Sequence, residues 1–372
     1  MDKKLRIGIV GASGWMAGAL IIGSEYDEMG FDLETKKGNK SSISVVKGLC
    51  DLNKDILIAK KNELCLDEAN LFTSYDELLS CQEIDAVIIA VPNNLHAQFT
   101  IKALKSGKHV FLEKPFSTTY KDSQELLKIS KENKLTTKVD YILVHYDEQQ
   151  KLKELINQNA FGEIASTHFT YRHPIQVEQT AGQTWKLSKE KSGGAIPMGI
   201  CHAISLTVFQ VNKNPITVIS KSNPAKIRNF DYDTQYDIMI IFENNIISII
   251  QGNIDFAEKY DARHTIIGTN GQFDYNPYNS LDTRVMWSSK TLQRNYSPDS
   301  NFAQHHLDSG NVWKHQCGLS VREFVKYSLN NEEDPLLGFN SPLVKRTEAI
   351  IWAAEESAFK NGMPVDVKKY FI

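Results

Sequence analysis

A glycine-rich turn follows the first apolar segment of the chain, within residues 6–18, RIGIVGASGWMAG. The run Leu5–Val10 is typical of a buried strand, and residues 16–26 have the pattern of a helix. Such a turn between a strand and a helix lets backbone N–H groups approach a pyrophosphate. The spacing departs from GxGxxG, because glycine stands at positions 11, 14 and 18, so a tight turn without a ligand stays an alternative.

Short β-branched runs keep alternating with helical patterns up to about residue 140. Further strands are expected at Ser44–Cys50, Ala86–Val91, His109–Leu112 and Thr137–Val144, and helices at 74–80, 94–106 and 120–133. This alternation is the signature of βαβ units on a parallel sheet. We therefore predict an α/β fold whose first part, residues 1–140, is a Rossmann-type dinucleotide-binding domain.

Residues 141–372 have a different pattern. After a helix at about 147–159, alternating strands are expected at Glu163–Arg172, Ile216–Lys221, Gln235–Phe242, Ile246–Asn253 and His264–Gly268. This pattern indicates an open, mainly antiparallel sheet with one face solvated or used for assembly. A helix over 342–360, ended by Asn361-Gly362, is expected to return toward the first domain. We predict a second α/β domain that binds substrate and forms oligomers.

Composition limits the classes of partner. The chain has 372 residues, a length that favours two domains, and 42 Lys plus Arg against 45 Asp plus Glu give a net charge of −3. Because this net charge is small, the chain has no strong overall electrostatic field to attract nucleic acid or anionic lipid. Five cysteines without a CxxC pair favour a reducing compartment, and no stretch approaches the roughly 20 apolar residues of a membrane span. We expect a cytoplasmic protein with neither nucleic-acid nor membrane partners.

An acidic residue after the second strand is expected to hydrogen-bond the adenosine ribose of NAD. Asp51 ends the second apolar run, 40 residues after Gly11, and a polar insert around 35–42 accounts for much of the long interval. Asp32 is nearer in count but follows a poor strand. We favour Asp51, and hence NAD over NADP, while a plain surface aspartate stays an alternative.

Two buried strands end in polar residues and a proline. Residues 86–96 read AVIIAVPNNLH, and residues 103–115 read ALKSGKHVFLEKP. Ligands of open α/β sheets collect at such carboxyl ends. The chain resembles the Gfo/Idh/MocA family of nicotinamide-dependent sugar and polyol oxidoreductases, whose EKP motif matches Glu113-Lys114-Pro115. Segments at 162–164, 268–271 and 356–365 also resemble that family, so the resemblance covers most of the chain.

The resemblance implies where the cofactor and the chemistry lie. Lys114 is expected beside the nicotinamide and the reacting hydroxyl, where an ammonium stabilises the charge that develops during hydride transfer. A lysine that only pairs with Glu113 is the structural alternative. The residues expected to contact NAD are Gly11, Ser13, Gly14, Trp15, Met16, Asp51, Val91, Pro92, Asn93, His96, Glu113, Lys114 and His145.

A second catalytic segment of the family resembles residues 193–202, GGAIPMGICH. His202 takes the general acid/base position, a role that imidazole suits near neutral pH. The family's aspartate four residues earlier is Met198 here, which can neither orient the imidazole nor raise its pKa. His202 acts unaided, or another acid such as Asp140 or Glu178 replaces the aspartate, or dehydrogenase activity has been lost.

Substrate contacts are expected in the EKP segment, in residues 193–202 and in the part of the chain between them. Arg172 suits a carboxylate or phosphate and Trp185 a sugar ring. The expected substrate-binding residues are Lys114, Arg172, His173, Trp185, Met198 and His202. His305, His306 and His315 have no carboxylate or thiolate at ligand spacing, so no metal site is predicted.

The predicted function is NAD-dependent hydride transfer between nicotinamide and a secondary alcohol or ketone of a sugar, polyol or sugar derivative. Two alternatives stay open: a non-catalytic NAD-binding sensor, and a lyase or hydrolase that uses tightly bound NAD transiently. Met198 favours the sensor, and the intact EKP motif opposes it; nucleotide that copurifies without net NADH production would indicate the lyase or hydrolase. The resemblance also implies a homodimer or homotetramer assembled through the antiparallel sheet.

Overall fold

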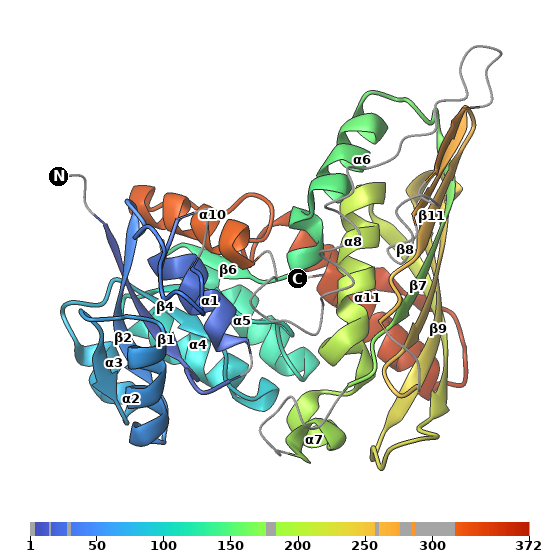
Figure 1. Cartoon of the computed structure of the whole chain (residues 1–372). Coiled ribbons are helices and arrows are strands. Elements are labelled where there is room, and N and C mark those ends of the chain that lie inside the picture. Colours follow the sequence, from blue (N-terminus) through green and yellow to red (C-terminus); the bar gives the residue numbers. More distant parts are fainter. Residues whose placement is uncertain are drawn as a thin grey trace. The chain divides into compact units, whose positions relative to one another are not determined.

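The computed structural model describes residues 4–14, 16–27, 31–175, 184–256, 260–275, 284–287 and 317–371 (Figure 1). The chain divides into two compact units. The first comprises Met1–Asp140, Val177–Thr184 and Asn311–Ser341, and the second comprises Tyr141–Gln176, Trp185–Gly310 and Pro342–Ile372.

The first unit is built on a six-stranded parallel sheet. Its order is β3-β2-β1-β4-β5-β6, with β1 Leu5–Val10, β2 Ser44–Cys50, β3 Asn70–Phe72, β4 Ala86–Ile89, β5 His109–Leu112 and β6 Thr137–Val139. The strand order reverses between β1 and β4, which places their carboxyl ends at the switch point where doubly wound sheets bind ligands. The predicted Rossmann-type fold is confirmed.

Helices cover the parallel sheet of this unit. They are α1 Ala17–Glu25, α2 Lys54–Glu63, α3 Tyr75–Ser80, α4 His96–Lys105, α5 Tyr120–Glu132 and α10 Cys317–Asn330. Helices α1 and α10 pack together, and α10 also contacts β1 and β5 (Figure 1). Residues 317–341 therefore belong to the first unit, which differs from the prediction of a continuous second domain from 141 to 372.

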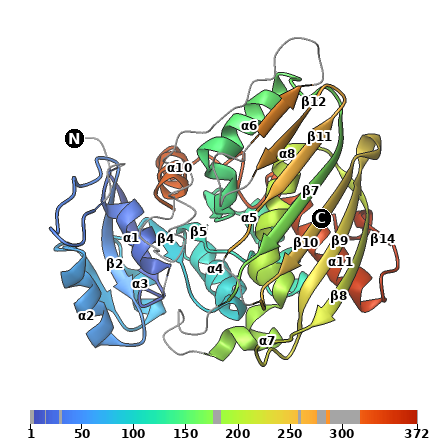
Figure 2. The same ribbon diagram turned by 45° about the vertical axis from the view of Figure 1, so that its right-hand side comes forward.

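The second unit contains an eight-stranded, mostly antiparallel sheet in its described residues (Figure 2). Its order is β13-β12-β11-β7-β10-β9-β8-β14, with β7 Ile164–Arg172, β8 Pro215–Pro224, β9 Asp233–Phe242, β10 Ile247–Asn253, β11 His264–Gly268, β12 Gly271–Tyr275, β13 Arg284–Trp287 and β14 Val365–Asp366. Side chains along β9 alternate between buried and half-buried. One face of the sheet is thus the core face, as predicted.

Helices pack on the core face of this second sheet. They are α6 Asp147–Asn157, α8 Cys201–Val211 and α11 Pro342–Phe359, and the short helix α7 Lys189–Ser192 precedes α8 in the chain. Helix α8 contacts β7 and β10, and α11 contacts α8 and β8 (Figure 2). The long C-terminal helix lies where the sequence predicts it, and its return toward the first domain stays a prediction.

The predicted strand Thr137–Val144 is only partly correct. Strand β6 ends at Val139, and Ile142–His145 form a 3-10 helix. Residues 141–146 are all buried, so this stretch has no alternation between buried and exposed side chains. The sequence pattern therefore does not distinguish a strand from another kind of buried segment here.

Candidate functional site

The turn between β1 and α1 lies tightly against the end of β4. Gly11 has a positive φ of 81°, and a Cβ atom built on it would lie 2.4 Å from the carbonyl oxygen of Ala90. Any larger residue would be strained by its backbone and would also clash with β4. Gly14 donates its N–H to the Gly11 carbonyl at 2.9 Å and closes the turn.

The N-terminus of α1 suits an anion. No described side chain caps this end, whose flanking residue is Met16, and no acidic residue lies in the first turn. Uncapped N–H groups and the helix dipole both attract negative charge, as a pyrophosphate would supply. The turn therefore fits the dinucleotide predicted from the sequence. Trp15 lies outside the described residues.

Asp51 lies beside this turn. Its Oδ2 accepts hydrogen bonds from the backbone N–H of Ser13 at 3.0 Å and from the Ser13 hydroxyl at 2.6 Å. Asp32, the alternative, instead accepts the N–H groups of Glu34 and Thr35 within its own turn. The structure thus brings together the strand-end acid and the glycine-rich turn, as a ribose contact requires.

The segment after β4 is held by His96. One ring nitrogen of His96 lies 2.7 Å from the Pro115 carbonyl oxygen, and the other lies 3.0 Å from that of Val91. Burial lowers the pKa of His96 to about 4, against the opposite effect of these two carbonyls, and a neutral imidazole donates to only one of them at a time. His96 thereby joins the turn containing Pro92 and the buried Asn93 to the EKP segment, and we interpret it as a positioning residue.

Lys114 and Asp140 leave the sheet at the same edge. Leu112 at the end of β5 pairs with Val139 at the end of β6. The Asp140 N–H donates to the Leu112 carbonyl at 2.9 Å, and the positive charge of Lys114 acts on the Asp140 carboxylate. Glu113, next to Lys114, is buried and donates its N–H to the Ile89 carbonyl at 3.0 Å.

His202 lies in the second unit, in the first turn of α8, and is 7% exposed. Met198 lies in the preceding π-helical turn, Ile196–Ile200, which is a feature found frequently at functional sites. The Tyr232 hydroxyl lies 4.0 Å from the Met198 sulfur. Met198 is 3% exposed, so the position that holds an acid in the family is a buried, mainly apolar one here.

An aromatic cluster lies near His202. The Tyr171 ring is 6.1 Å from the His202 ring and 5.7 Å from the Tyr260 ring, and His173 is 5.2 Å from Tyr260. Tyr171 and His173 share a face because they are two residues apart in an extended segment. Arg172 points to the opposite face, is exposed, and lies 4.0 Å from Asp261, so the structure does not join it to this cluster.

Two further predicted residues, Trp185 and His145, belong to the second unit, and others lie outside the described part of the chain. Trp185 is half-buried in the 3-10 helix Thr184–Leu187, with the Lys186 ammonium 5.7 Å from its ring. His145 is buried in the second unit, and its approach to the nicotinamide stays a prediction. Glu178, His305, His306 and His315 lie outside the described residues, among which no cluster of metal ligands occurs.

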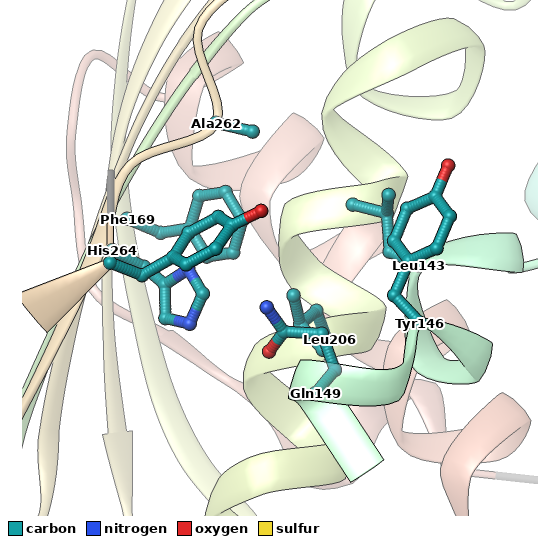
Figure 3. A pocket seen from close by; sticks show the side chains of 8 residues that line it. Leu143, Tyr146, Gln149, Phe169, Leu206, Ala262 and His264 are labelled. Carbon is teal, nitrogen blue, oxygen red and sulfur yellow. The ribbon is translucent and has the colours of Figure 1, made fainter. Parts of the chain in front are cut away.

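A small pocket lies inside the second unit, between the sheet and the helices (Figure 3). The enclosed space is about large enough for one water molecule, far smaller than a typical ligand site. The lining residues are Leu143, Tyr146, Gln149, Phe169, Leu206, Ala262, His264 and Tyr275. His264 stacks on Phe169 at 5.1 Å, and Gln210 donates to Gln149 at 2.7 Å. These polar side chains thus lie inside an apolar shell, and we interpret the pocket as part of the core.

Sequence reasoning missed Tyr260 and named Asp140 only as an alternative acid. Tyr260 lies between the strands expected at Ile246–Asn253 and His264–Gly268, in a segment without periodicity, so no local signal marks it. Asp140 did carry a signal, because it directly follows an apolar strand in the same way as Glu113.

Comparison with known proteins identifies the family. Residues 5–141 match the oxidoreductase family model described as an NAD-binding Rossmann fold, and residues 149–274 match the GFO/IDH/MocA C-terminal domain. The chain belongs to the GFO/IDH/MocA family. The resemblance to this family is confirmed, and with it the NAD-binding character of the first unit.

Relatives with known sequences share the family. An uncharacterized oxidoreductase of Streptococcus pneumoniae is 39% identical over 186 residues, covering 49% of this chain and 50% of the relative. The 2,7-anhydro-N-acetylneuraminate hydratase of Escherichia coli is 39% identical over 146 residues, covering 39% and 38%. The matched part thus spans half or less of the length of either relative.

Solved structures share the fold over nearly the whole chain. Levoglucosan dehydrogenase with NADH and levoglucosan is 20% identical with a TM-score of 0.79, covering 98% of this chain and 100% of that one. The WlbA dehydrogenase of Bordetella pertussis, with NADH and UDP-GlcNAcA, is 18% identical with a TM-score of 0.78, covering 98% of both. At these identities the likeness shows the fold.

One helical stretch, Lys189–Val211, is long and apolar enough to cross a membrane. Its most apolar window is entirely buried inside the protein, which is the environment of a core helix.

Proposed function

We propose that this chain is an NAD-dependent oxidoreductase that transfers a hydride between nicotinamide and a secondary alcohol or ketone of a sugar, polyol or sugar derivative. The observation that carries the proposal is the order of residues along one sheet edge. Gly11 packs against Ala90, which follows β4. Glu113 follows β5 and donates its N–H to the carbonyl oxygen of Ile89 in β4. Lys114 is therefore next to the edge that fits the dinucleotide.

The residues that would hold NAD are those of the glycine-rich turn and Asp51. The turn amides and the uncapped α1 N-terminus would bind the pyrophosphate, and Asp51 the adenosine ribose. When bound, NAD supplies the acceptor or donor of the hydride. The polar segment Val91–Asn93, held by His96, would line the same edge.

Lys114 and His202 would handle the proton of the reacting hydroxyl. In the oxidation direction, Lys114 would accept the hydroxyl proton as an uncharged amine and become the ammonium, while the carbinol hydrogen would leave with its electron pair as hydride. His202 would assist by hydrogen bonding to the same oxygen. The cluster of Tyr171, His173 and Tyr260 supplies flat faces and polar edges that suit a sugar ring.

A second candidate is a lyase or hydratase that uses bound NAD transiently. Two relatives, from Escherichia coli and Mediterraneibacter gnavus, carry the name 2,7-anhydro-N-acetylneuraminate hydratase. Met198 in place of an aspartate also favours chemistry other than simple net oxidation. In this case the sugar would be oxidised and then reduced again, and free NADH would not accumulate.

The first experiment is incubation of the purified protein with NAD and a panel of sugars, inositols, nucleotide sugars and 2,7-anhydro-N-acetylneuraminate. Nicotinamide absorbance reports net redox, and mass spectrometry of the sugar reports net-neutral conversion. We expect Lys114→Ala to bind NAD normally and to lose about 100-fold or more in turnover, as for deletion of an acid/base group. Lys105→Ala, on the exposed side of α4, is the matched control.

The outcomes separate the three functions. NADH formation that depends on Lys114 supports the dehydrogenase, and conversion of a sugar without NADH supports the transient use of NAD. NAD binding without conversion of any substrate would favour a sensor. Turnover of Lys114→Ala equal to that of the wild type would remove Lys114 from the mechanism. We further propose a cytoplasmic homodimer or homotetramer.

A further inference from the structure

The turn before α1 is hydrogen-bonded to the end of β2 through three successive residues. The N–H groups of Gly11 and Ala12 donate to the Cys50 carbonyl at 2.9 and 3.2 Å. Ser13 then donates its N–H and its hydroxyl to Oδ2 of Asp51, at 3.0 and 2.6 Å. Ser13 is therefore the residue of this turn that contacts the side chain of Asp51, and it does so with two donors.

These two bonds occupy one oxygen of the Asp51 carboxylate. A carboxylate oxygen accepts about two hydrogen bonds, and Ser13 supplies both to Oδ2. Among the residues that the structure describes, none donates a hydrogen bond to Oδ1. The backbone of Asp51 is held separately, because its N–H donates to the Phe72 carbonyl of β3 at 3.2 Å. Oδ1 is thus the oxygen left for a ligand, and Ser13 sets the rotation of the carboxylate.

Both side chains are accessible to solvent, so packing alone does not fix them. Ser13 is exposed and Asp51 is half-buried. An aspartate in such a place samples several rotamers, and ordering its side chain on a ligand costs free energy. The bond from the Ser13 hydroxyl to the carboxylate is charge-assisted, which is the stronger kind of hydrogen bond. Ser13 therefore orders the carboxylate before a ligand arrives.

We infer that Ser13 favours NAD over NADP as a positioning residue, one that fixes the Asp51 carboxylate and leaves Oδ1 for the adenosine ribose. The inference rests on the proposed contact between Asp51 and that ribose. The ribose hydroxyls of NAD donate to a fixed carboxylate, whereas the 2′-phosphate of NADP is repelled by it. The hydroxyl hydrogen of Ser13 is already bonded to Asp51, so Ser13 has none left to donate to that phosphate.

The test measures the binding of NAD and of NADP to the full chain by calorimetry, without turnover. In Ser13→Ala we expect NAD to bind about two- to tenfold more weakly, the range for ordering one side chain, and NADP to bind equally well or better. A general defect in the turn would weaken both nucleotides alike, so the ratio of the two dissociation constants separates a selective role from a structural one.

Two further variants isolate the hydroxyl group. Ser13→Thr keeps the hydroxyl and the backbone N–H, and it should restore the wild-type ratio of the dissociation constants. Ser106→Ala is the matched control, because Ser106 is also exposed and its hydroxyl donates to the Lys102 carbonyl at the end of α4, at 2.9 Å. It should leave the binding of both nucleotides unchanged.

A double-mutant cycle tests whether Ser13 acts through Asp51. In the Asp51→Ala background, Ser13→Ala should change the affinity for NAD by less than about twofold, because the carboxylate that Ser13 holds is gone. An equal loss in both backgrounds would show that Ser13 contacts the cofactor itself, and it would overturn the inference. Unchanged or tighter binding of NAD in Ser13→Ala would also overturn it.

Failure of the proposed function gives a different result. If Asp51→Ala leaves the binding of both nucleotides unchanged, the ribose contact is absent and the inference fails with it. If Asp51→Ala changes the ratio of the dissociation constants and Ser13→Ala does not, the ribose contact stands and only the inference fails. If NADP binds too weakly to measure, the loss for NAD in Ser13→Ala and its disappearance in the Asp51→Ala background decide.

Discussion

At the scale of single residues, we propose that the choice of cofactor depends on the edge of the parallel sheet. Asp51 ends β2 and binds the backbone and hydroxyl of Ser13, so its carboxylate is already held at the turn. An anion in this place accepts the hydroxyls of an NAD ribose and repels the 2′-phosphate of NADP. The long polar insert before β2 does not displace it, because the parallel pairing of β1 and β2 continues to Val10 and Cys50.

We expect Asp51→Ala to weaken NAD binding about tenfold or more while NADP binding stays equal or improves. The loss is that of charge-assisted hydrogen bonds, worth roughly 1.5–3 kcal/mol. Titration of each nucleotide by fluorescence or calorimetry measures it. Asp55→Ala, in the exposed first turn of α2, is the matched control. Equal losses for both nucleotides would show that Asp51 does not reach the ribose.

The residues that follow strands were predictable, and those in irregular segments were not. Gly11, Asp51 and Lys114 are far apart in the sequence, yet parallel strands end at one edge, so their neighbourhood followed from the strand pattern alone. The meeting of Tyr171 with Tyr260 depends on how an irregular segment packs against β7, for which the sequence has no periodic signal. The hydrogen bond between Asp140 and Ser320 joins residues 180 positions apart, so the sequence pattern could not predict it.

At the scale of elements, the helices that have little local signal were not predicted from the sequence. Helix α2 has Leu57 as its only buried residue, so it shows no apolar stripe. Helix α10 follows residues 270–315, which are rich in Asn, Ser and His and have no readable strand or helix pattern. Its place beside α1 is a long-range contact. The loop after α10 is held to β6 by the buried pair of Lys138 with Asp334.

We expect Asp334→Ala to lower the free energy of unfolding by about 3 kcal/mol, because it leaves a buried ammonium with only the partner Glu323. Asp334 also accepts the N–H groups of Leu336 and Leu337, so the loop would lose its turn as well. Chemical denaturation measures the change. Glu332→Ala, an exposed neighbour, is the control, and adding Lys138→Met to Asp334→Ala should restore part of the loss. A change below about 1 kcal/mol would contradict this account.

At the scale of the whole molecule, the outward face of the second sheet carries exposed isoleucines. Ile247 on β10 is 42% exposed and pairs directly with Ile241 on β9, and Ile267 on β11 is 37% exposed. Ser166 on β7 pairs with both Ile247 and Ile267, so these side chains form one row across four strands. A row of isoleucines on an open face is typical of a protein interface, and a second copy of the chain presents the same row.

We expect Ile247→Lys to shift the protein from a dimer or tetramer to smaller species, because a charge would be buried at the centre of a self-complementary interface. Size-exclusion chromatography with light scattering measures the mass over a concentration series. Ile56→Lys, an equally exposed isoleucine on α2, is the matched control and should leave the mass unchanged. Because Ile247 faces outward, NAD binding by the first unit should persist. A wild-type protein that is monomeric at every concentration, or an unchanged mass in Ile247→Lys, would exclude assembly through this face.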